Sequence, residues 1–390
     1  MQRVNFERGG CEKTPLVRFI PPHSFGSYMV ISRTPFRVSF FGGGTDFPSW
    51  YREHGGTVLA ATIDKYCYLT ARYLPPFFEH RYRAVYSKIE NTNEIDEIGH
   101  PAVREALRFM EMKRGVEIHH DGDLPARSGM GSSSAFTVGL LHALHAVQGR
   151  MVSKHQLALQ GIHLEQEDLK ETVGSQDQIM TAYGGFNQVA FLESGEIIVR
   201  PVILPQSRLD ELCGHLMLFY TGVKRTSSDI ASTYAHEMEG RRRHLRILKD
   251  LVNEALGLLT SQQQISGFGH LLHEAWQIKR NLSASVSNEH IDEIYAEARG
   301  AGALGGKLLG AGGGGFMLLF VPPERQADVK RRLSKLICVP FEFDFMGSQI
   351  IYYRPDPEYA EAEAARSGAM LPVFRELITS AKEPAAFTHV

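Results

Sequence analysis

Residues 121–136 read DGDLPARSGMGSSSAF and constrain the fold most, because a proline-led loop rich in glycine and serine runs directly into a helical pattern. Apolar residues follow at the spacing of one helix face: Phe136, Leu140, Leu141 and Leu144. We therefore expect a helix with its N-cap near Ser132 or Ser133, where a hydroxyl group satisfies a free backbone N–H group.

This loop has the features of an anion site. Gly129 and Gly131 allow the backbone to approach a ligand without an intervening side chain. Free N–H groups and the positive end of the helix dipole favour phosphate there. An ordinary capped loop is the alternative, since serine-rich turns are common. The stretch is not a Walker A loop, because no Gly-Lys-Ser/Thr follows.

The composition narrows the class of protein. The 390 residues suffice for one large or two ordinary domains, and 43% hydrophobic with 22% charged residues is typical of a soluble globular protein. A net charge of −2 gives no general attraction to nucleic acid or to a membrane surface. Four cysteines without a CxxC motif, no apolar run of membrane-spanning length and no signal-like N-terminus predict a cytoplasmic protein.

Strand-like and helical segments alternate irregularly, which favours the α+β class over a doubly wound sheet. We predict an extension at 1–28, an N-terminal domain at 29–203 with the phosphate loop, a C-terminal domain at 204–355 and a tail at 356–390.

Residues 300–315 contain two GxGxxG matches, but one precedes a strand and the other follows a helix, so neither is a dinucleotide fingerprint. Tight packing and a floor beneath a ligand both remain possible roles for these glycines.

Three stretches resemble one family. They are 33–46 (RTPFRVSFFGGGTD), 124–135 (LPARSGMGSSSA) and 307–315 (KLLGAGGGG). In order and spacing they resemble the three motifs of the GHMP kinases. Smaller details, such as 173–178 (VGSQDQ) and 302–307 (GALGGK), are closest to the sugar 1-kinases that act on D-glycero-D-manno-heptose 7-phosphate.

The resemblance implies a fold and an activity. The N-terminal domain would be similar to domain 2 of ribosomal protein S5, and the C-terminal domain would be ferredoxin-like. The protein would use ATP and Mg²⁺ to phosphorylate the anomeric hydroxyl of the heptose 7-phosphate, for nucleotide-heptose and surface polysaccharide synthesis. The alternatives are another sugar 1-kinase, of the fucokinase or galactokinase type, and a non-catalytic regulator that binds sugar and ATP. A monomer or homodimer without nucleic-acid or membrane partners is expected.

The same resemblance assigns the chemistry. Asp177, expected in a loop between Gly174 and Gly184, would be the base that accepts the proton of the sugar hydroxyl. Arg37 would keep Asp177 ionised and neutralise charge in the transition state. Ser133 and Glu165 would hold Mg²⁺, with Glu167 as the rival carboxylate. Each assignment has a purely structural alternative: Asp177 could be a cap or turn residue, Arg37 a surface residue on an edge strand, and Glu165 part of a solvated helix face.

The remaining site residues follow the motifs. The predicted ATP-binding residues are Pro125, Arg127, Ser128, Gly129, Met130, Gly131, Ser132, Ser133 and Ser134. The predicted substrate-binding residues are Gly43, Gly44, Thr45, Asp46, Gly222, Gly312 and Gly313. Gly43 and Gly44 stand where galactokinase carries Glu and His, which leaves room for a larger or phosphorylated sugar. Because net charge cannot steer a phosphorylated substrate here, a local basic cluster must capture it; the unranked candidates are Asp64, Lys65, Arg72, Lys224 and Arg225.

Overall fold

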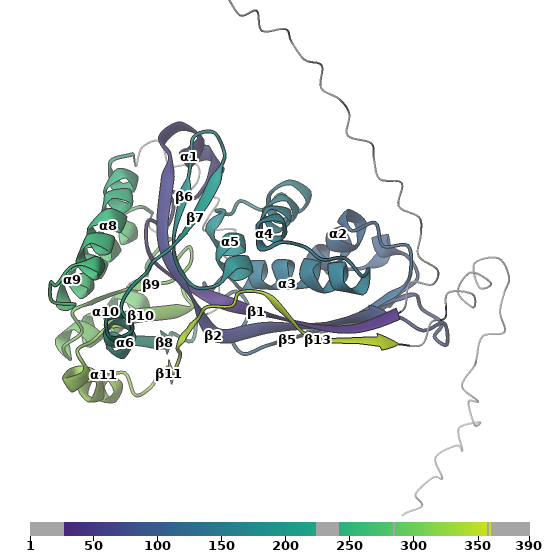
Figure 1. The fold of residues 1–390 in the computed structure, drawn as a ribbon. Coiled ribbons are helices and arrows are strands. Elements are labelled where there is room, and N and C mark those ends of the chain that lie inside the picture. The colour runs from purple at the N-terminus through teal and green to yellow at the C-terminus, as the bar shows by residue number, and fades with distance from the viewer. Residues whose placement is uncertain (1–26, 224–241, 284, 357–358, 360–390) are drawn as a thin grey trace, which may run out of the picture.

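The computed structural model describes residues 27–223, 242–283, 285–356 and 359 (Figure 1). Two predicted phosphate-binding residues, Lys224 and Arg225, lie outside these residues, as do most of the predicted extension and tail. No helix in the ranges given is both long and apolar enough to cross a bilayer.

The larger sheet has the strand order β13-β1-β2-β5-β3-β4, and β12 and β6 also pair with β2. All its pairings are antiparallel except β3 with β5. Its two longest strands, β1 and β2, are rich in β-branched and aromatic residues, which suit a pleated and half-buried surface. The strands are β1 (Ser27–Phe41), β2 (Gly56–Tyr73), β3 (Tyr82–Val85), β4 (Ile89–Thr92), β5 (Val116–Gly122), β6 (Phe186–Phe191), β7 (Ile197–Pro201), β12 (Phe343–Asp344) and β13 (Gln349–Asp356).

Helices α2 to α5 gather on one face of this sheet (Figure 1). Helix α3 packs directly on β1 and β2 and is buried on nearly all sides, in agreement with its mostly apolar sequence. The helical elements of this part are α1 (Pro48–His54), the 3₁₀ turn η1 (Ile95–Glu97), α2 (Pro101–Phe109), α3 (Ser132–Val147), α4 (Lys154–His163), the π-helical turn η2 (Leu164–Asp168) and α5 (Gln176–Tyr183).

A second, antiparallel sheet has the order β11-β8-β10-β9. Its strands are β8 (Leu216–Tyr220), β9 (Gly305–Leu308), β10 (Phe316–Phe320) and β11 (Ile337–Val339). The helical elements around it are α6 (Gln206–His215), α8 (Arg242–Thr260), α9 (Ser266–Arg280), α10 (Glu289–Gly300), the 3₁₀ turn η4 (Pro323–Arg325) and α11 (Gln326–Arg332). The run FMLLF of β10 is fully buried, as expected for a strand covered on both faces.

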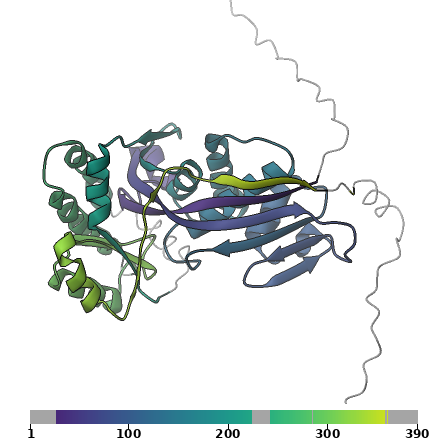
Figure 2. The same ribbon diagram turned by 60° about the horizontal axis from the view of Figure 1, so that its bottom comes forward.

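One face of the second sheet shares an apolar core with the first sheet, and its other face packs in a second, smaller apolar cluster. Phe268 of α9 meets Phe40 and Phe41 of β1 edge to face, with ring centroids 5.5 and 5.2 Å apart. After the second sheet the chain returns to the first, where β13 pairs with β1 as its edge strand (Figure 2). The α+β class is confirmed by this mixture of sheets and helices. The predicted domain limits at 203/204 and 355/356 stay predictions, and β12 and β13 lie in the larger sheet although they belong to the predicted C-terminal range.

Candidate active site

The glycine-serine loop enters α3 through Gly131, which has φ +73° and is the N-cap residue. The N-cap therefore lies beside Ser132, as expected, and α3 begins at Ser132, but the expectation that a serine hydroxyl caps the helix is wrong. The physical reason is that the Ser132 hydroxyl accepts a hydrogen bond from the backbone N–H of Arg127, at 3.1 Å, instead of capping the helix. A left-handed conformation at this point suits glycine, which has no Cβ to clash.

The glycine-rich third motif packs against this loop. A Cβ on Gly310 would lie 2.4 Å from the Cα of Gly129, and a Cβ on Gly315 would lie 2.1 Å from the carbonyl oxygen of Ser128. Close backbone packing therefore accounts for these two glycines. Gly310 also lines the cavity, so both roles left open by the sequence meet there. As expected, neither GxGxxG match opens a helix, because Gly315 precedes β10 and residue 305 begins β9.

The loop borders a cavity of about 750 Å³, a size typical of small-molecule sites. Its walls come from β1, α3, α5, η2 and, from the second sheet region, α9, β9 and residues 310–311. The predicted site residues that line it are Arg37, Gly43, Gly44, Asp46, Arg127, Gly129, Gly131, Ser132, Ser133, Ser134, Glu165 and Asp177. Those that do not line it are Thr45, Pro125, Ser128, Met130, Gly222, Gly312 and Gly313.

Some of the latter have visible structural roles. The Thr45 hydroxyl donates to the carbonyl oxygens of Gly42 and Thr57, at 2.8 and 2.9 Å, and so ties the loop after β1 to β2. The backbone N–H of Gly313 donates to the carbonyl of Val286. Their assignment to substrate binding stays a prediction.

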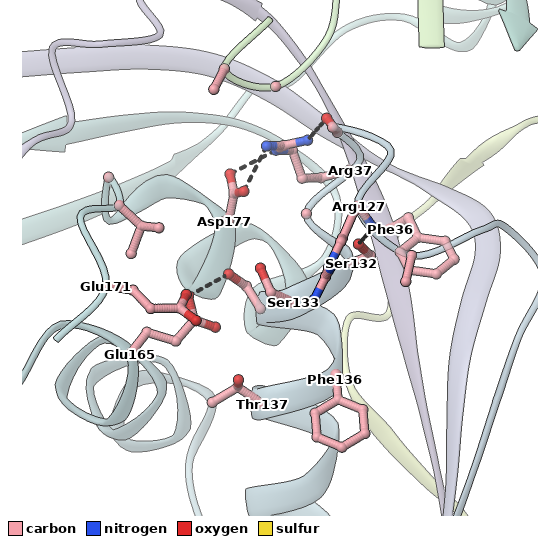
Figure 3. Close-up of a pocket in the computed structure, with 18 of the residues that line it drawn as sticks. Phe36, Arg37, Arg127, Ser132, Ser133, Phe136, Thr137, Glu165, Glu171 and Asp177 are labelled. Carbon is pink, nitrogen blue, oxygen red and sulfur yellow. Dashed lines mark hydrogen bonds and ion pairs between the residues drawn. The ribbon is translucent and has the colours of Figure 1, made fainter. Parts of the chain in front are cut away.

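Arg37 and Asp177 both line the cavity and point directly toward each other (Figure 3). Arg37 Nε donates to Asp177 Oδ1 at 2.7 Å and Nη2 to Oδ2 at 2.6 Å, a bidentate pair. Arg37 Nη1 donates to the Gly129 carbonyl at 2.7 Å, which joins the pair to the glycine-serine loop. Arg37 is only 3% exposed and lies on an interior strand, so the surface alternative is wrong. Asp177 is in the first turn of α5 and not in a loop, because the helix begins at Gln176.

Two further acidic side chains, Glu165 and Glu171, lie close together on the side of Ser133 away from Asp177 (Figure 3). Glu165 Oε2 accepts hydrogen bonds from Ser134 and Gln178, at 3.0 and 2.6 Å. Its other oxygen, Oε1, is buried and has no partner among the described residues. Burial, together with Glu171, raises the pKa of Glu165 to about 8.

These features fit a divalent cation. An unpartnered, buried carboxylate oxygen beside a second carboxylate and an exposed serine is a donor set for Mg²⁺, which prefers oxygen ligands and takes few from protein. The rival Glu167 is exposed and does not line the cavity, because two positions along a helical turn point in different directions. Within the described ranges, no three His, Cys, Asp or Glu side chains group as an all-protein metal site.

Asp46 closes another wall. It is 1% exposed, and its oxygens accept backbone N–H groups of Gly44 at 2.9 Å and Gln176 at 3.3 Å. It therefore ties the loop after β1 to the start of α5, which carries Asp177. Burial and the charge of Asp177 raise the pKa of Asp46. Nearby, beside Gly43, Ser39 Oγ and Gln176 Oε1 are buried, line the cavity and have no partner in the part of the chain described.

Three lysines that line the cavity were not predicted as site residues, and one of them, Lys88, lies just before β4. The other two are Lys279, from the last turn of α9, and Lys307, from β9. Lys307 belongs to a resembling motif but received no role, and Lys279 lies in an ordinary amphipathic helix without any local signal. The predicted phosphate-binding residues Asp64, Lys65 and Arg72 do not line the cavity, since Lys65 pairs with Asp64 and Arg72 with Glu117, and their assignment stays a prediction.

The part of the cavity around Phe136 is lined by aromatic rings. The rings of His100 and Phe136 stack with centroids 4.9 Å apart, and Tyr86 meets His100 edge to face at 4.7 Å. All three residues line the cavity. Flat apolar rings of this kind suit a planar heterocycle, whereas the opposite end around Asp46 is polar and charged.

Comparison with known proteins agrees with this geometry. Residues 101–185 match the family model of the GHMP kinases N terminal domain, and residues 241–337 match that of the GHMP kinases C terminal. The chain is 28% identical over 315 residues to D-glycero-alpha-D-manno-heptose 7-phosphate kinase of Campylobacter jejuni, covering 78% of this chain and 93% of that protein. It is 25% identical over 333 residues to a galactokinase of Pyrococcus furiosus, covering 75% and 89%.

A solved structure, described as a D-glycero-D-manno-heptose 1-phosphate kinase from Bacteroides thetaiotaomicron, superposes with a TM-score of 0.65 at 26% identity and covers 83% of this chain and 99% of that one. The predicted GHMP kinase fold is thereby confirmed. Both domain matches, together with a cavity in which the three motifs meet, show that the chain belongs to the GHMP kinases and is an ATP-dependent kinase.

Proposed function

We propose that this kinase transfers the γ-phosphoryl group of ATP to the anomeric hydroxyl of a phosphorylated sugar, D-glycero-D-manno-heptose 7-phosphate. The observation that carries the proposal is the bidentate pair of Arg37 and Asp177, which stands between the glycine-serine loop and the polar end of one cavity. Phosphoryl transfer depends mostly on positioning and charge neutralisation, and this arrangement supports both.

ATP would occupy the side bounded by α3. Its phosphates would lie on the loop around Gly129, Gly131 and Ser132, at the positive end of the α3 dipole. Its base would extend toward the rings of His100 and Phe136. Buried Ser128 and Met130 would shape the loop from beneath. Mg²⁺, held by Ser133 and Glu165, would neutralise charge on the phosphates.

The acceptor sugar would occupy the polar end. Its reacting hydroxyl would donate its proton to Asp177, which acts as general base. Arg37 would hold that carboxylate in place and compensate the charge on the transferring group. Ser39 Oγ and Gln176 Oε1, both without partners in the described structure, would bind other hydroxyl groups, next to the space left by Gly43.

Two alternative functions can be tested against this proposal. Another sugar 1-kinase, of the fucokinase or galactokinase type, would use the same Arg37 and Asp177 on a neutral sugar. A non-catalytic sugar- and ATP-binding regulator is disfavoured, because both residues are present and paired. If the acceptor is the heptose 7-phosphate, we also propose that the kinase serves nucleotide-heptose and surface polysaccharide synthesis in the cytoplasm. We propose that it acts as a monomer or homodimer.

The test is ADP release with a panel of acceptors: D-glycero-D-manno-heptose 7-phosphate, the free heptose, L-fucose and D-galactose. Phosphorus NMR of the product identifies the phosphorylated oxygen. The proposal predicts a new anomeric phosphate on the heptose 7-phosphate and at least about a hundredfold lower kcat/KM for the free heptose, equal to about 2.8 kcal/mol at 1.4 kcal/mol per decade. Faster turnover of fucose or galactose would refute it, and no turnover of any acceptor would favour the regulator.

A further inference from the structure

Lys279 and Lys307 bring two amine groups from the second sheet region to the wall of the cavity. Lys307 is 5% exposed and Lys279 is partly buried. Burying an amine of this kind is costly without a compensating partner, so two adjacent cases require an explanation.

Their hydrogen bonds satisfy only part of their capacity. Lys279 Nζ donates to the carbonyl oxygens of Leu308 and Gly310, at 3.0 and 2.5 Å, and Lys307 Nζ donates to that of Phe40, at 2.9 Å. An ammonium group has three N–H donors. Within the described residues, one donor of Lys279 and two of Lys307 thus have no acceptor.

The surrounding charge is positive. Burial lowers the pKa of both lysines; Arg37 lowers the pKa of Lys279 further, Lys279 and Arg37 do so for Lys307, and the carboxylate of Asp46 acts in the opposite direction. Neither side chain of the pair forms an ion pair with Asp46 in the described structure, since the Asp46 oxygens accept backbone N–H groups instead. Asp177 is already engaged by Arg37. The lysine pair therefore lacks a direct counter-anion.

We propose that Lys279 and Lys307 bind the phosphate group that the acceptor sugar already carries. This inference rests on the proposed function and names the residues of its acceptor subsite. Both lysines lie near Arg37 and Asp46, and Lys279 donates to Gly310, which packs against Gly129. Glu165 and Glu171 lie on the other side of Ser133 from Arg37 (Figure 3). A doubly charged phosphate accepts several charge-assisted hydrogen bonds at once, which matches the spare donors.

The pKa of Lys279, lowered to about 7 by burial and by Arg37, supports this assignment. A phosphate bound beside it would favour the charged ammonium form. The charged groups that face Lys279 are Arg37, Asp46 and Lys307, from β1, the loop after it and β9. Binding of the sugar phosphate at pH 7.5 should therefore take up protons, which calorimetry in two buffers of different ionisation enthalpy measures.

The decisive experiment compares Lys279→Met and Lys307→Met with the wild type. Lys249→Met is the matched control, because Lys249 Nζ also donates to a main-chain carbonyl, that of His54, outside the cavity. Calorimetry in the presence of ADP measures the affinity for the heptose 7-phosphate and for the free heptose without turnover. ATP and ADP affinities are measured separately.

Each cavity variant should weaken binding of the sugar phosphate by about tenfold to a hundredfold relative to the free sugar, with the ratio of ATP to ADP affinity unchanged. The control should match the wild type. The assignment would be overturned if the variants lost the same affinity for both sugars or lost none. It would also be overturned if they lost affinity only for ATP, which would place the lysines at the γ-phosphate. If Lys307→Met melts below the assay temperature, Lys307→Arg should keep the preference for the sugar phosphate, and its loss would count against the proposal.

The proposed acceptor and the role of the two lysines are tested separately. A wild type that binds the free heptose as well as the phosphorylated one contradicts the proposed acceptor, whatever the lysines do. A wild type that prefers the phosphorylated sugar, with Lys279→Met and Lys307→Met retaining that preference, contradicts only the assignment of the lysines.

Discussion

The pair of Arg37 and Asp177 supports a prediction that separates catalysis from stability. Asp177→Asn keeps the shape of the side chain but removes its charge and one of the two acceptor oxygens that Arg37 uses. Breaking a buried ion pair by changing one partner costs about 3–5 kcal/mol. Here the Asp177 side chain is 24% exposed and Arg37 keeps its hydrogen bond to Gly129, so we expect a loss of about 2–3 kcal/mol in the free energy of unfolding.

Turnover should fall by about 10² or more, because the acceptor hydroxyl loses its base, while ATP binding persists. The double variant Arg37→Met with Asp177→Asn should recover part of the lost stability, since no unpaired charge remains, but should stay inactive. Urea unfolding measures stability, ADP release measures turnover and calorimetry measures ATP affinity.

Asp96→Asn is the matched control, because Asp96 also pairs with an arginine, Arg108, but at the surface. An exposed pair contributes up to about 1 kcal/mol, so the control should keep full turnover and nearly full stability. Turnover of Asp177→Asn near that of the wild type would refute the role of general base. A double variant with normal activity would show that the pair is only structural.

Three further predictions are independent of the first. Gly131→Val should abolish ATP binding measured by calorimetry, because φ is +73° and a Cβ would lie 3.3 Å from Arg37 Cγ; unchanged affinity would contradict the phosphate loop. Glu165→Gln should remove Mg²⁺-dependent turnover and Glu167→Gln should not, and the reverse result would restore the rival. Burial lowers the pKa of His142 from 6.5 to about 4, so the wild type should lose unfolding free energy as pH falls from 6.5 toward 4, whereas His142→Gln should lose less over that range.

Much of the local structure was predictable because it depends on neighbours in the chain. The glycine-serine loop and the helix after it follow from turn residues and apolar periodicity. The order of three motifs indicated the family before any contact was known. The pairing of Asp177 with Arg37 was also expected, although the two residues lie 140 positions apart.

Other features depended on which side of an element faces inward. Glu165 and Glu167 are equivalent in sequence terms, and only the packing of η2 buries the first and exposes the second. The serine cap was wrong because the Ser132 hydroxyl bonds to the backbone of Arg127, a choice set by the shape of the loop.

The sequence by itself determined the glycine-serine loop before α3, the α+β class and which acid and arginine pair, because each rests on a short-range pattern or on a motif. The tertiary structure alone decided where the basic groups meet. Lys65 and Arg72 are neutralised locally by Asp64 and Glu117, whereas Lys279 and Lys307 reach the cavity from elements far along the chain. The physical reason is that spacing along the chain does not fix the direction of a side chain, whereas the packing of α9 and β9 against β1 does.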